Sequence, residues 1–421
     1  MKKQLLSRMS LAFSLIAVIL LTGSLVRQPK EVKANVSNIT FNKQNLNNMN
    51  EKLVQANTNF GFKLFSQIFA KDSNKNIFVS PSSVAIALQM TYNGAAGDTQ
   101  QAMAQTLQLQ GMSLAEINQS QLALTQSLTK IDPKVQLDIA NSLWLKQEFP
   151  FKPEFLQTTE KYYQAKITNL DFNNPNSVNI INDWVSQNTN SKIPTIIDSI
   201  EPSAVLFLIN AIYFKGNWQK EFSKSDTKEQ PFTLLNGTRK QHPLMSQKGK
   251  YRYYETNEFQ AIALPYGSGR LSMYVFLPKN NIKLTDFYNK LSAQTWQQWM
   301  KQFSLKDGEI ILPKFKLEYN LTLNEALKAL GMEVAFQDRA NFSNMTAKEV
   351  QIDEVKHKTF VEVNEEGTEA AAVTSIGIRV ASAPIREEPP FKMLVDRPFF
   401  CAIHDNQTGT ILFMGSIVDP K

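Results

Sequence analysis

This sequence has almost no cysteine and very little histidine: one Cys and three His occur in 421 residues. A single Cys excludes a disulfide framework and every metal or iron–sulfur site built from several cysteines. Three scattered His leave little material for a histidine metal centre, so we expect neither a metal nor another cofactor. Glycine (16) and proline (18) are also scarce, and 43% apolar with 20% charged residues are globular proportions. Collagen-like, coiled-coil and wholly disordered chains are therefore excluded.

The motifs of common catalytic and nucleotide-binding sites are missing as well. The sequence has no G-x-S-x-G nucleophile elbow, no P-loop and no G-x-G-x-x-G. Cys401 lies in an apolar, strand-like run, which indicates a buried and inert thiol. Among the histidines we expect His404 at a strand end, His242 on the surface and His357 as a structural residue. We therefore assign no catalytic residue and do not expect an enzyme.

The positive charge of the chain is concentrated at its N-terminus. The formal charge is +7, but residues 1–34 hold six basic residues and one acid, which leaves 39 basic and 37 acidic residues behind them. The basic start is followed by the apolar run Leu11–Leu21, and Val32-Lys33-Ala34 offers a cleavage site. This pattern predicts a signal peptide over residues 1–34 and a secreted, periplasmic or cell-envelope protein. A lipoprotein-like box carries Ser24 where the lipidated Cys would stand, and an uncleaved membrane anchor is the alternative.

The rest of the chain shows no signature of a nucleic-acid or polysaccharide partner. A Lys/Arg-dense stripe with interleaved aromatic residues is absent, which disfavours nucleic-acid binding. The helix expected near Leu114–Lys130 has one Lys and no Arg, so a heparin-type site is not supported.

Residues 35–51 and the chain behind them differ in composition. Residues 35–50 contain seven Asn and few apolar side chains, which predicts an Asn-rich flexible tether over 35–51. No internal repeat or Pro/Gly-rich seam divides residues 52–421, so a single domain is expected there. Helical patterns crowd the first half and strand patterns the second, which favours an α+β fold.

The apolar periodicity places the main elements. Ser80-Pro81 suits the N-cap and first position of a helix. Helices are expected at Val84–Met90, Gln101–Leu107, Leu114–Leu128, Asn179–Val185 and Leu323–Leu330. Strands are expected at Val135–Ile139, through most of Tyr251–Phe276, and at Leu312–Leu317, Thr359–Val363, Phe399–His404 and Ile411–Ile417. The apolar run Ala204–Phe214 fits either a strand buried on both faces or a core helix.

Residues 364–384 carry the most informative pattern. Alternate positions from Thr368 to Val380 are all small or apolar, whereas the intervening ones are small, polar or charged apart from Val373. This period of two predicts a strand with one face fit for a core. Loop-like sequence flanks it on both sides, so the segment is either an ordinary edge strand or a strand-competent loop that stores a conformational change.

Several separated motifs resemble those of the serpin family, and the resemblance extends from about Phe60 to Pro420. The matching motifs, in chain order, are NIFVSPSS at 76–83, NAIYFKGNW at 210–218, LPKF at 312–315, HKTFVEVNEEGTEAAA at 357–372 and VDRPF at 395–399. The resemblance implies three β-sheets with eight to nine helices and an exposed reactive-centre loop. It also implies suicide inhibition: a target protease cleaves the loop, forms an acyl-enzyme, and is trapped when the loop inserts into the central sheet.

The same resemblance implies roles for particular residues. The hinge that inserts first would comprise Glu365, Glu366, Gly367, Thr368, Glu369, Ala370, Ala371 and Ala372. A polar cluster beneath the opening sheet, the shutter, would comprise Ser80, Ser83, Asn210 and His357. The breach, where insertion starts, would contain Trp218 and Lys314, with a predicted Lys314–Glu365 ion pair. Bulky or charged groups are absent from the inward parity of the hinge, which favours an inhibitory serpin.

The usual loop length of the family places the scissile bond between Ala381 and Ser382. A small residue before the bond suits an elastase-like or subtilisin-like serine protease, whereas Arg379 or Arg386 would suit a trypsin-like enzyme in another register. The expected partner is a target protease bound covalently to a monomer, with loop–sheet polymers possible. The alternatives are a non-inhibitory binding or chaperone-like serpin, an inhibitor of papain-like cysteine proteases, and a hydrolase. For a hydrolase the sequence shows no recognisable set of catalytic residues.

Overall fold

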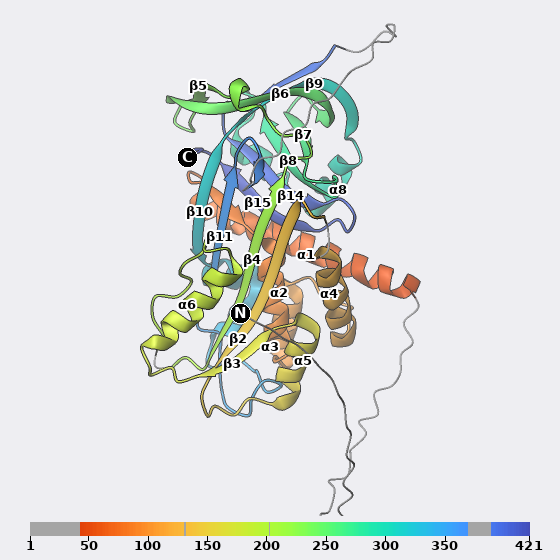
Figure 1. Ribbon diagram of the computed structural model, residues 1–421. Coiled ribbons are helices and arrows are strands. Elements are labelled where there is room, and N and C mark those ends of the chain that lie inside the picture. Colours follow the sequence, from red (N-terminus) through yellow and green to blue (C-terminus); the bar gives the residue numbers. More distant parts are fainter. Residues whose placement is uncertain (1–42, 130–131, 202, 369–388) are drawn as a thin grey trace, which may run out of the picture. The chain divides into compact units, whose positions relative to one another are not determined.

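The structure is a computed structural model that describes residues 43–129, 132–201, 203–368 and 389–421. Residues 42–421 form one compact unit. Two hydrogen-bonded strand networks run through the described residues, one with six strands and one with nine. Helices surround them, and the architecture is α+β, as the sequence predicted (Figure 1).

The six-stranded network is the central sheet. Its strands lie in the order β10 (Phe315–Thr322), β11 (Lys356–Val363), β12 (Gly367–Thr368), β4 (Leu206–Asn217), β2 (Val135–Lys146) and β3 (Lys166–Leu170). All neighbours are antiparallel except β2 and β3. The long strand β4 resolves the open choice for Ala204–Phe214 in favour of a strand.

The nine-stranded network is held together by one long strand, β6. Its order is β1 (Ile77–Val79), β15 (Ile411–Ile417), β14 (Phe399–Asp405), β8 (Leu271–Pro278), β7 (Phe259–Pro265), β6 (Arg239–Glu255), β9 (Ser304–Pro313) and β13 (Phe391–Leu394), with β5 (Lys228–Thr233) also paired to β6. β6 pairs with β9 over residues 244–253 and with β7 only over 252–255. Divided at β6, the strands make three sheets in all.

Nine α-helices are present in the described part of the chain. They are α1 (Lys43–Asp72), α2 (Pro81–Tyr92), α3 (Gly97–Thr106), α4 (Leu114–Leu128), α5 (Pro153–Tyr163), α6 (Asn176–Asn188), α7 (Leu284–Tyr288), α8 (Ala293–Met300) and α9 (Asn324–Leu327). Short 3-10 turns cover Lys224–Asp226 and Glu333–Phe336. Because α1 begins at Lys43, the second half of the segment expected as a tether is helical.

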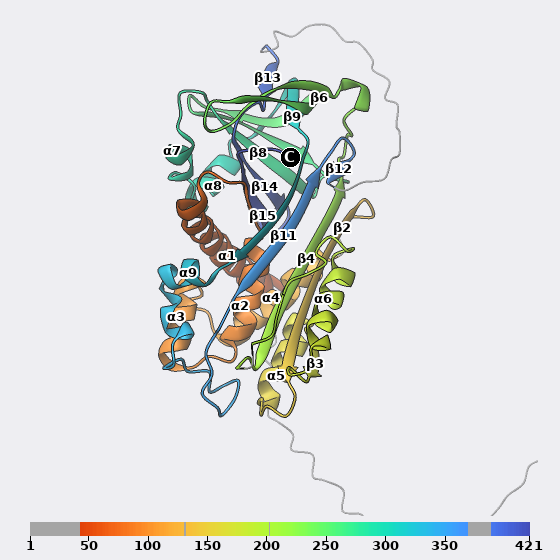
Figure 2. The same ribbon diagram turned by 90° about the vertical axis from the view of Figure 1, so that its left-hand side faces the viewer.

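Helices cover the central sheet on both faces. Trp184 and Val185 of α6 pack with Ile209 and Ala211 of β4 on one face. The other face meets α2, and Figure 2 shows the sheet between α6 and α2. Burial on both faces explains why the apolar run of β4 is almost unbroken.

The predicted strand Leu312–Leu317 is in fact the junction of two strands in different sheets. β9 ends at Pro313 and β10 begins at Phe315. Lys314 between them donates its N–H to Pro243 O at 3.0 Å, and its own carbonyl contacts His242 Nε2 at 2.5 Å. The chain therefore leaves one sheet and enters the next at Lys314, a change that a short apolar alternation cannot reveal.

The structure also tests the predictions for His242, for the helix after Leu323 and for Cys401. His242 is buried and not on the surface, because its ring Nε2 contacts the carbonyl oxygen of Lys314. The helix expected over Leu323–Leu330 ends as an α-helix at Leu327 and continues as a π turn, Lys328–Met332, around Gly331 with φ +106°. Cys401 is buried as expected, and burial raises the pKa of its thiol to about 12. Within the described chain no helix has the length and apolarity needed to cross a membrane.

Candidate functional site

The hinge follows β11 through a tight turn and then returns directly to the central sheet. Asn364 closes the turn: its Oδ1 accepts the N–H groups of Glu366 (3.0 Å) and Gly367 (3.2 Å). The chain then forms β12, in which Thr368 pairs with Val363 of β11 on one side and with Gly216 of β4 on the other. The first residues of the hinge therefore already occupy a position between β11 and β4. Glu369, Ala370, Ala371 and Ala372, together with Ala381 and Ser382, lie outside the described residues.

Gly367 is required by the closeness of β12 to β4. Its φ is +152°, and a Cβ at this position would lie 2.1 Å from the carbonyl oxygen of Gly216. That oxygen belongs to the backbone of a central strand and cannot move aside. No residue with a side chain fits here without displacing the hinge.

The two hinge carboxylates within the described residues, those of Glu365 and Glu366, are each held by a lysine. The predicted ion pair is present: Lys314 Nζ lies 2.9 Å from Glu365 Oε2. Thr227 Oγ1 also donates to Glu365 Oε1 at 2.8 Å. Burial raises the pKa of Glu365, but the bonds from Lys314 and Thr227 outweigh it and leave this pKa below its usual value. Glu366 pairs with the exposed Lys224 at 2.6 Å.

Trp218 lies directly under the hinge. Its indole Nε1 donates to Asn364 O at 2.9 Å, and its backbone N–H donates to Glu366 O at 2.9 Å. Its ring stacks on Tyr266, with centroids 4.4 Å apart and planes 11° from parallel. The structure thus brings both predicted breach residues, Trp218 and Lys314, to the hinge.

Tyr266 and Thr227 also contact the hinge, and sequence reasoning missed both. Tyr266 follows the last residue of β7 and is fully buried. Thr227 follows a 3-10 turn. Single polar residues at the end of an element have no periodic signal, and only the fold shows what they face.

The four predicted shutter residues meet at the N-terminus of α2: Ser80 and Ser83 belong to its first turn, Asn210 to β4 and His357 to β11. Ser80 caps α2 by accepting the N–H of Ser83. The backbone N–H of Ser80 donates to His357 Nε2 at 3.0 Å, which ties β11 to α2. Ser83 Oγ donates to Asn210 Oδ1, which ties β4 to the same turn. One helix turn therefore holds both strands that flank β12.

The shutter extends one strand further than the sequence indicated. Asn210 Nδ2 donates to Asn141 Oδ1 at 2.5 Å, and Asn141 Nδ2 donates to Tyr163 O at 2.6 Å. Asn141 of β2 is the register partner of Asn210. The polar chain therefore reaches from α2 across β4 and β2 to α5. Without the strand register, Asn141 is an ordinary polar residue in a strand.

Beyond β12 the flanking strands β4 and β11 approach each other to within 8 Å between Cα atoms in places, but no ladder pairs them in the described residues. The strand pairings of the described residues connect β4 to β11 only through the two residues of β12. A cavity of about 390 Å³ lies farther along, lined by Leu206–Asn210 of β4, by Ser83 to Thr91 of α2, and by Asp353–His357 at the start of β11. The cavity therefore begins at the shutter residues Ser83, Asn210 and His357 and extends from them away from the hinge.

Comparison with known proteins identifies this arrangement. The family described as serpin (serine protease inhibitor) matches residues 55–420. The chain belongs to the serpin family. It is 35% identical to the leukocyte elastase inhibitor of Homo sapiens, over 88% of this chain and 100% of that one. It is 34% identical to a serpin-like protein of Thermococcus kodakarensis, over 88% and 86%.

Solved serpin structures share the fold. The thermophilic serpin tengpin in its native state aligns with a TM-score of 0.79 at 32% identity, over 91% of this chain and 96% of that one. Human thyroxine-binding globulin complexed with thyroxine aligns with a TM-score of 0.81 at 26% identity, over 89% and 100%. These relatives support the serpin fold, and their names include both an elastase inhibitor and a thyroxine-binding globulin.

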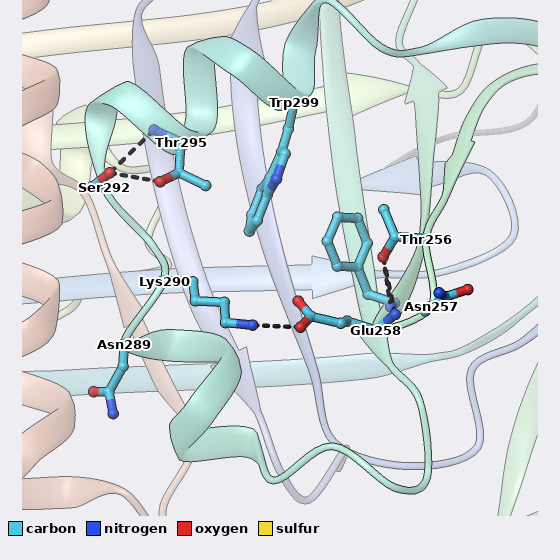
Figure 3. Close-up of a pocket in the computed structure, with 9 residues that line it drawn as sticks. Thr256, Asn257, Glu258, Asn289, Lys290, Ser292, Thr295 and Trp299 are labelled. Carbon is cyan, nitrogen blue, oxygen red and sulfur yellow. Dashed lines mark hydrogen bonds and ion pairs between the residues drawn. The ribbon is translucent and has the colours of Figure 1, made fainter.

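A second hollow of this serpin, of about 660 Å³, opens between α8 and the turn that joins β6 to β7 (Figure 3). Some of its polar groups pair with each other: Lys290 Nζ lies 2.5 Å from Glu258 Oε1, and Ser292 Oγ accepts the N–H of Thr295. None of the predicted site residues lines it. Within the described ranges, no three His, Cys, Asp or Glu side chains form a group that could hold a metal ion.

The shutter histidine predicts a loss of stability in mild acid. His357 is 5% exposed, and burial lowers its pKa to about 4, so at neutral pH its unprotonated Nε2 accepts the Ser80 N–H. In the unfolded chain the pKa of this ring is about 6.5, so below that pH the unfolded chain binds a proton that the native state does not bind. We expect about 2–3 kcal/mol of the free energy of unfolding to be lost as the pH falls from 6.5 towards 4.

Urea unfolding midpoints measured between pH 7.5 and 4.5 would test this. His357→Gln should flatten the fall in the midpoint over that range. His404→Gln is the comparison, because burial also lowers the pKa of His404, which lies in β14 away from the shutter. If the curves of wild type and His357→Gln run parallel, the shutter histidine is not the group responsible.

Proposed function

We propose that this serpin is an irreversible, suicide-substrate inhibitor of serine proteases. The observation that carries the proposal is β12, the hinge strand that has already entered the central sheet. Beyond it, no ladder pairs β4 with β11 in the described residues, and a cavity lined by both strands and α2 lies past the shutter. A hinge that already lies between two strands with no ladder between them can continue inward by separating them once the loop is cut.

The sequence that follows the hinge suits that movement. Thr368 points into the protein and is 2% exposed. The residues of the same parity that follow, such as Ala370, Ala372 and Thr374, are small and uncharged. Continuation of β12 in the same register would bury these side chains at little steric or desolvation cost.

The chemistry belongs to the protease. Its serine Oγ attacks the carbonyl carbon of Ala381, the bond to Ser382 breaks, and the new α-amino group of Ser382 leaves with a proton. The acyl ester to Ala381 remains. Insertion of the loop then carries the bound protease away from the geometry in which water could hydrolyse that ester. The driving free energy is the difference between the open and the completed central sheet.

A small residue at Ala381 favours an elastase-like or subtilisin-like target, and similarity to a leukocyte elastase inhibitor supports this choice. We further propose that the protein acts as a monomer after export, with residues 1–34 as the signal peptide. Cleavage after Arg379 or Arg386 would instead direct it to trypsin-like enzymes.

The test is incubation of the purified protein with pancreatic elastase, subtilisin and trypsin, followed by denaturing gel electrophoresis. We expect a covalent complex that resists boiling in detergent, and a released C-terminal fragment whose mass corresponds to a start at Ser382. A fragment starting at Val380 would move the scissile bond. Cleavage of the loop by all three enzymes without any complex would identify a non-inhibitory serpin, as the likeness to thyroxine-binding globulin allows.

A further inference from the structure

The ring of Tyr266 fills space that is open because Gly216 of β4 has no side chain. A Cβ on Gly216 would lie 2.9 Å from Tyr266 Cδ1, so the tyrosine ring fits only because Gly216 has none. One face of the ring stacks on Trp218, and its edge meets Phe214 with centroids 5.0 Å apart. Tyr266 is 0% exposed. Its ring is therefore fixed, and so is the direction of its hydroxyl.

The hydroxyl of Tyr266 points at the first inserted residue. Tyr266 Oη lies 2.8 Å from Thr368 Oγ1, its one hydrogen-bond partner among the described residues. Thr368 is in register with Gly216, the same glycine that makes room for the ring. If the hinge withdraws, both hydroxyls lose their partner, and the one on Tyr266 stays buried and unpaired, which disfavours withdrawal.

We propose that Tyr266 is a positioning residue for loop insertion, whose hydroxyl holds Thr368 in the first register position of the central sheet. The inference rests on the proposed inhibitory function. We call Gly216, Trp218 and Tyr266 the hinge seat. A cleaved loop that starts from a seated Thr368 continues in a fixed register, whereas an unseated hinge must first find the correct one of two parities.

How often the hinge leaves the hinge seat can be measured without any protease. The backbone N–H groups of Trp218 and Phe222 donate to Glu366 O and Glu365 O, so their hydrogen exchange reports how often the hinge leaves. Deuterium exchange of peptides covering 217–222 and 364–368 should therefore respond to the two hydroxyls. The set of variants is Tyr266→Phe, Thr368→Val, Thr368→Ser and the double variant of Tyr266→Phe with Thr368→Val.

We expect exchange to speed up about five- to tenfold in Tyr266→Phe and in Thr368→Val, the effect of one net hydrogen bond. The double variant should show no further increase, and Thr368→Ser, which keeps the hydroxyl, should stay near wild type. Tyr274→Phe is the matched control, since Tyr274 is equally buried but donates to Asn406. Unchanged exchange in Tyr266→Phe, or effects that multiply in the double variant, would overturn the proposal.

The functional measurement is how efficiently the protein traps a protease. Tyr266→Phe should raise the number of inhibitor molecules consumed per protease inactivated by about two- to fivefold, because slower insertion lets water release more of the acyl-enzyme. If wild type traps no protease while exchange responds as expected, the seat stands and the inhibitory function fails. If wild type traps protease and neither exchange nor consumption responds to the hydroxyls, the seat fails and the function stands.

Discussion

Replacement of Thr368 by Arg is expected to convert the protein from an inhibitor into a substrate. Thr368 is 2% exposed between β11 and β4, with its hydroxyl on Tyr266. An arginine there would have to bury an unpaired charge, which costs several kcal/mol. Insertion competes with hydrolysis of the acyl-enzyme, so trapping should fall at least about 100-fold while the loop is still cut.

The measurement is the fraction of protease recovered active after incubation with excess inhibitor, together with the complex band on a denaturing gel. Thr368→Val is the matched control, because it keeps the shape of threonine and adds no charge. It should still trap, with only the modest rise in consumption expected from the lost hydroxyl. If Thr368→Arg traps as well as Thr368→Val, the loop does not insert through the hinge seat.

Much of the fold follows from local sequence. Ser80-Pro81 marks the start of α2 because serine caps the first turn and proline needs no hydrogen bond there. α4 spans Leu114–Leu128 as predicted, and Ser113 with Glu116 forms a capping box at its start. Such elements are specified by residues close together in the chain. The sequence also resolves their type because helix and strand periods differ.

The errors arise where distant chain segments decide the outcome. The break at Lys314 depends on hydrogen bonds to Pro243 and His242, which lie some 70 residues earlier in another strand. His242 is buried for the same reason, although its neighbours are polar. The helical start of α1 at Lys43 within an Asn-rich stretch is a further difference.

Some contacts of the candidate site could likewise be predicted from the sequence, and others could not. The Lys314–Glu365 pair and the shutter contacts of Ser80, Ser83 and His357 were expected from motifs that resemble a known family, and the structure contains them. Tyr266 and Asn141 were not expected. Asn141 meets Asn210 through the register of β2 and β4, and register is a property of the sheet that a single chain segment does not display. Tyr266 lies just past the end of β7, and only the fold brings it to Thr368.

The largest expected change in stability follows cleavage of the loop. In the uncleaved fold, β4 and β11 are paired in the described residues only through β12, and a cavity of about 390 Å³, lined by both strands and α2, lies past the shutter. A fully inserted strand of roughly ten residues would add hydrogen bonds to both neighbours, each contributing about 1 kcal/mol net. For a domain of this size the unfolding temperature should rise by about 10 to 20 °C.

Thermal unfolding followed by circular dichroism, before and after limited cleavage by a protease that cuts the loop and is then removed, provides the measurement. Cleaved Thr368→Arg is the decisive comparison, because its loop is cut but cannot pass the hinge seat. It should gain no more than a few degrees, whereas cleaved Thr368→Val should gain nearly as much as wild type. An equal gain in all three would mean that cleavage stabilises the protein without insertion at β12. No gain in wild type would mean that the space between β4 and β11 stays open after cleavage, as in a serpin that binds and does not trap.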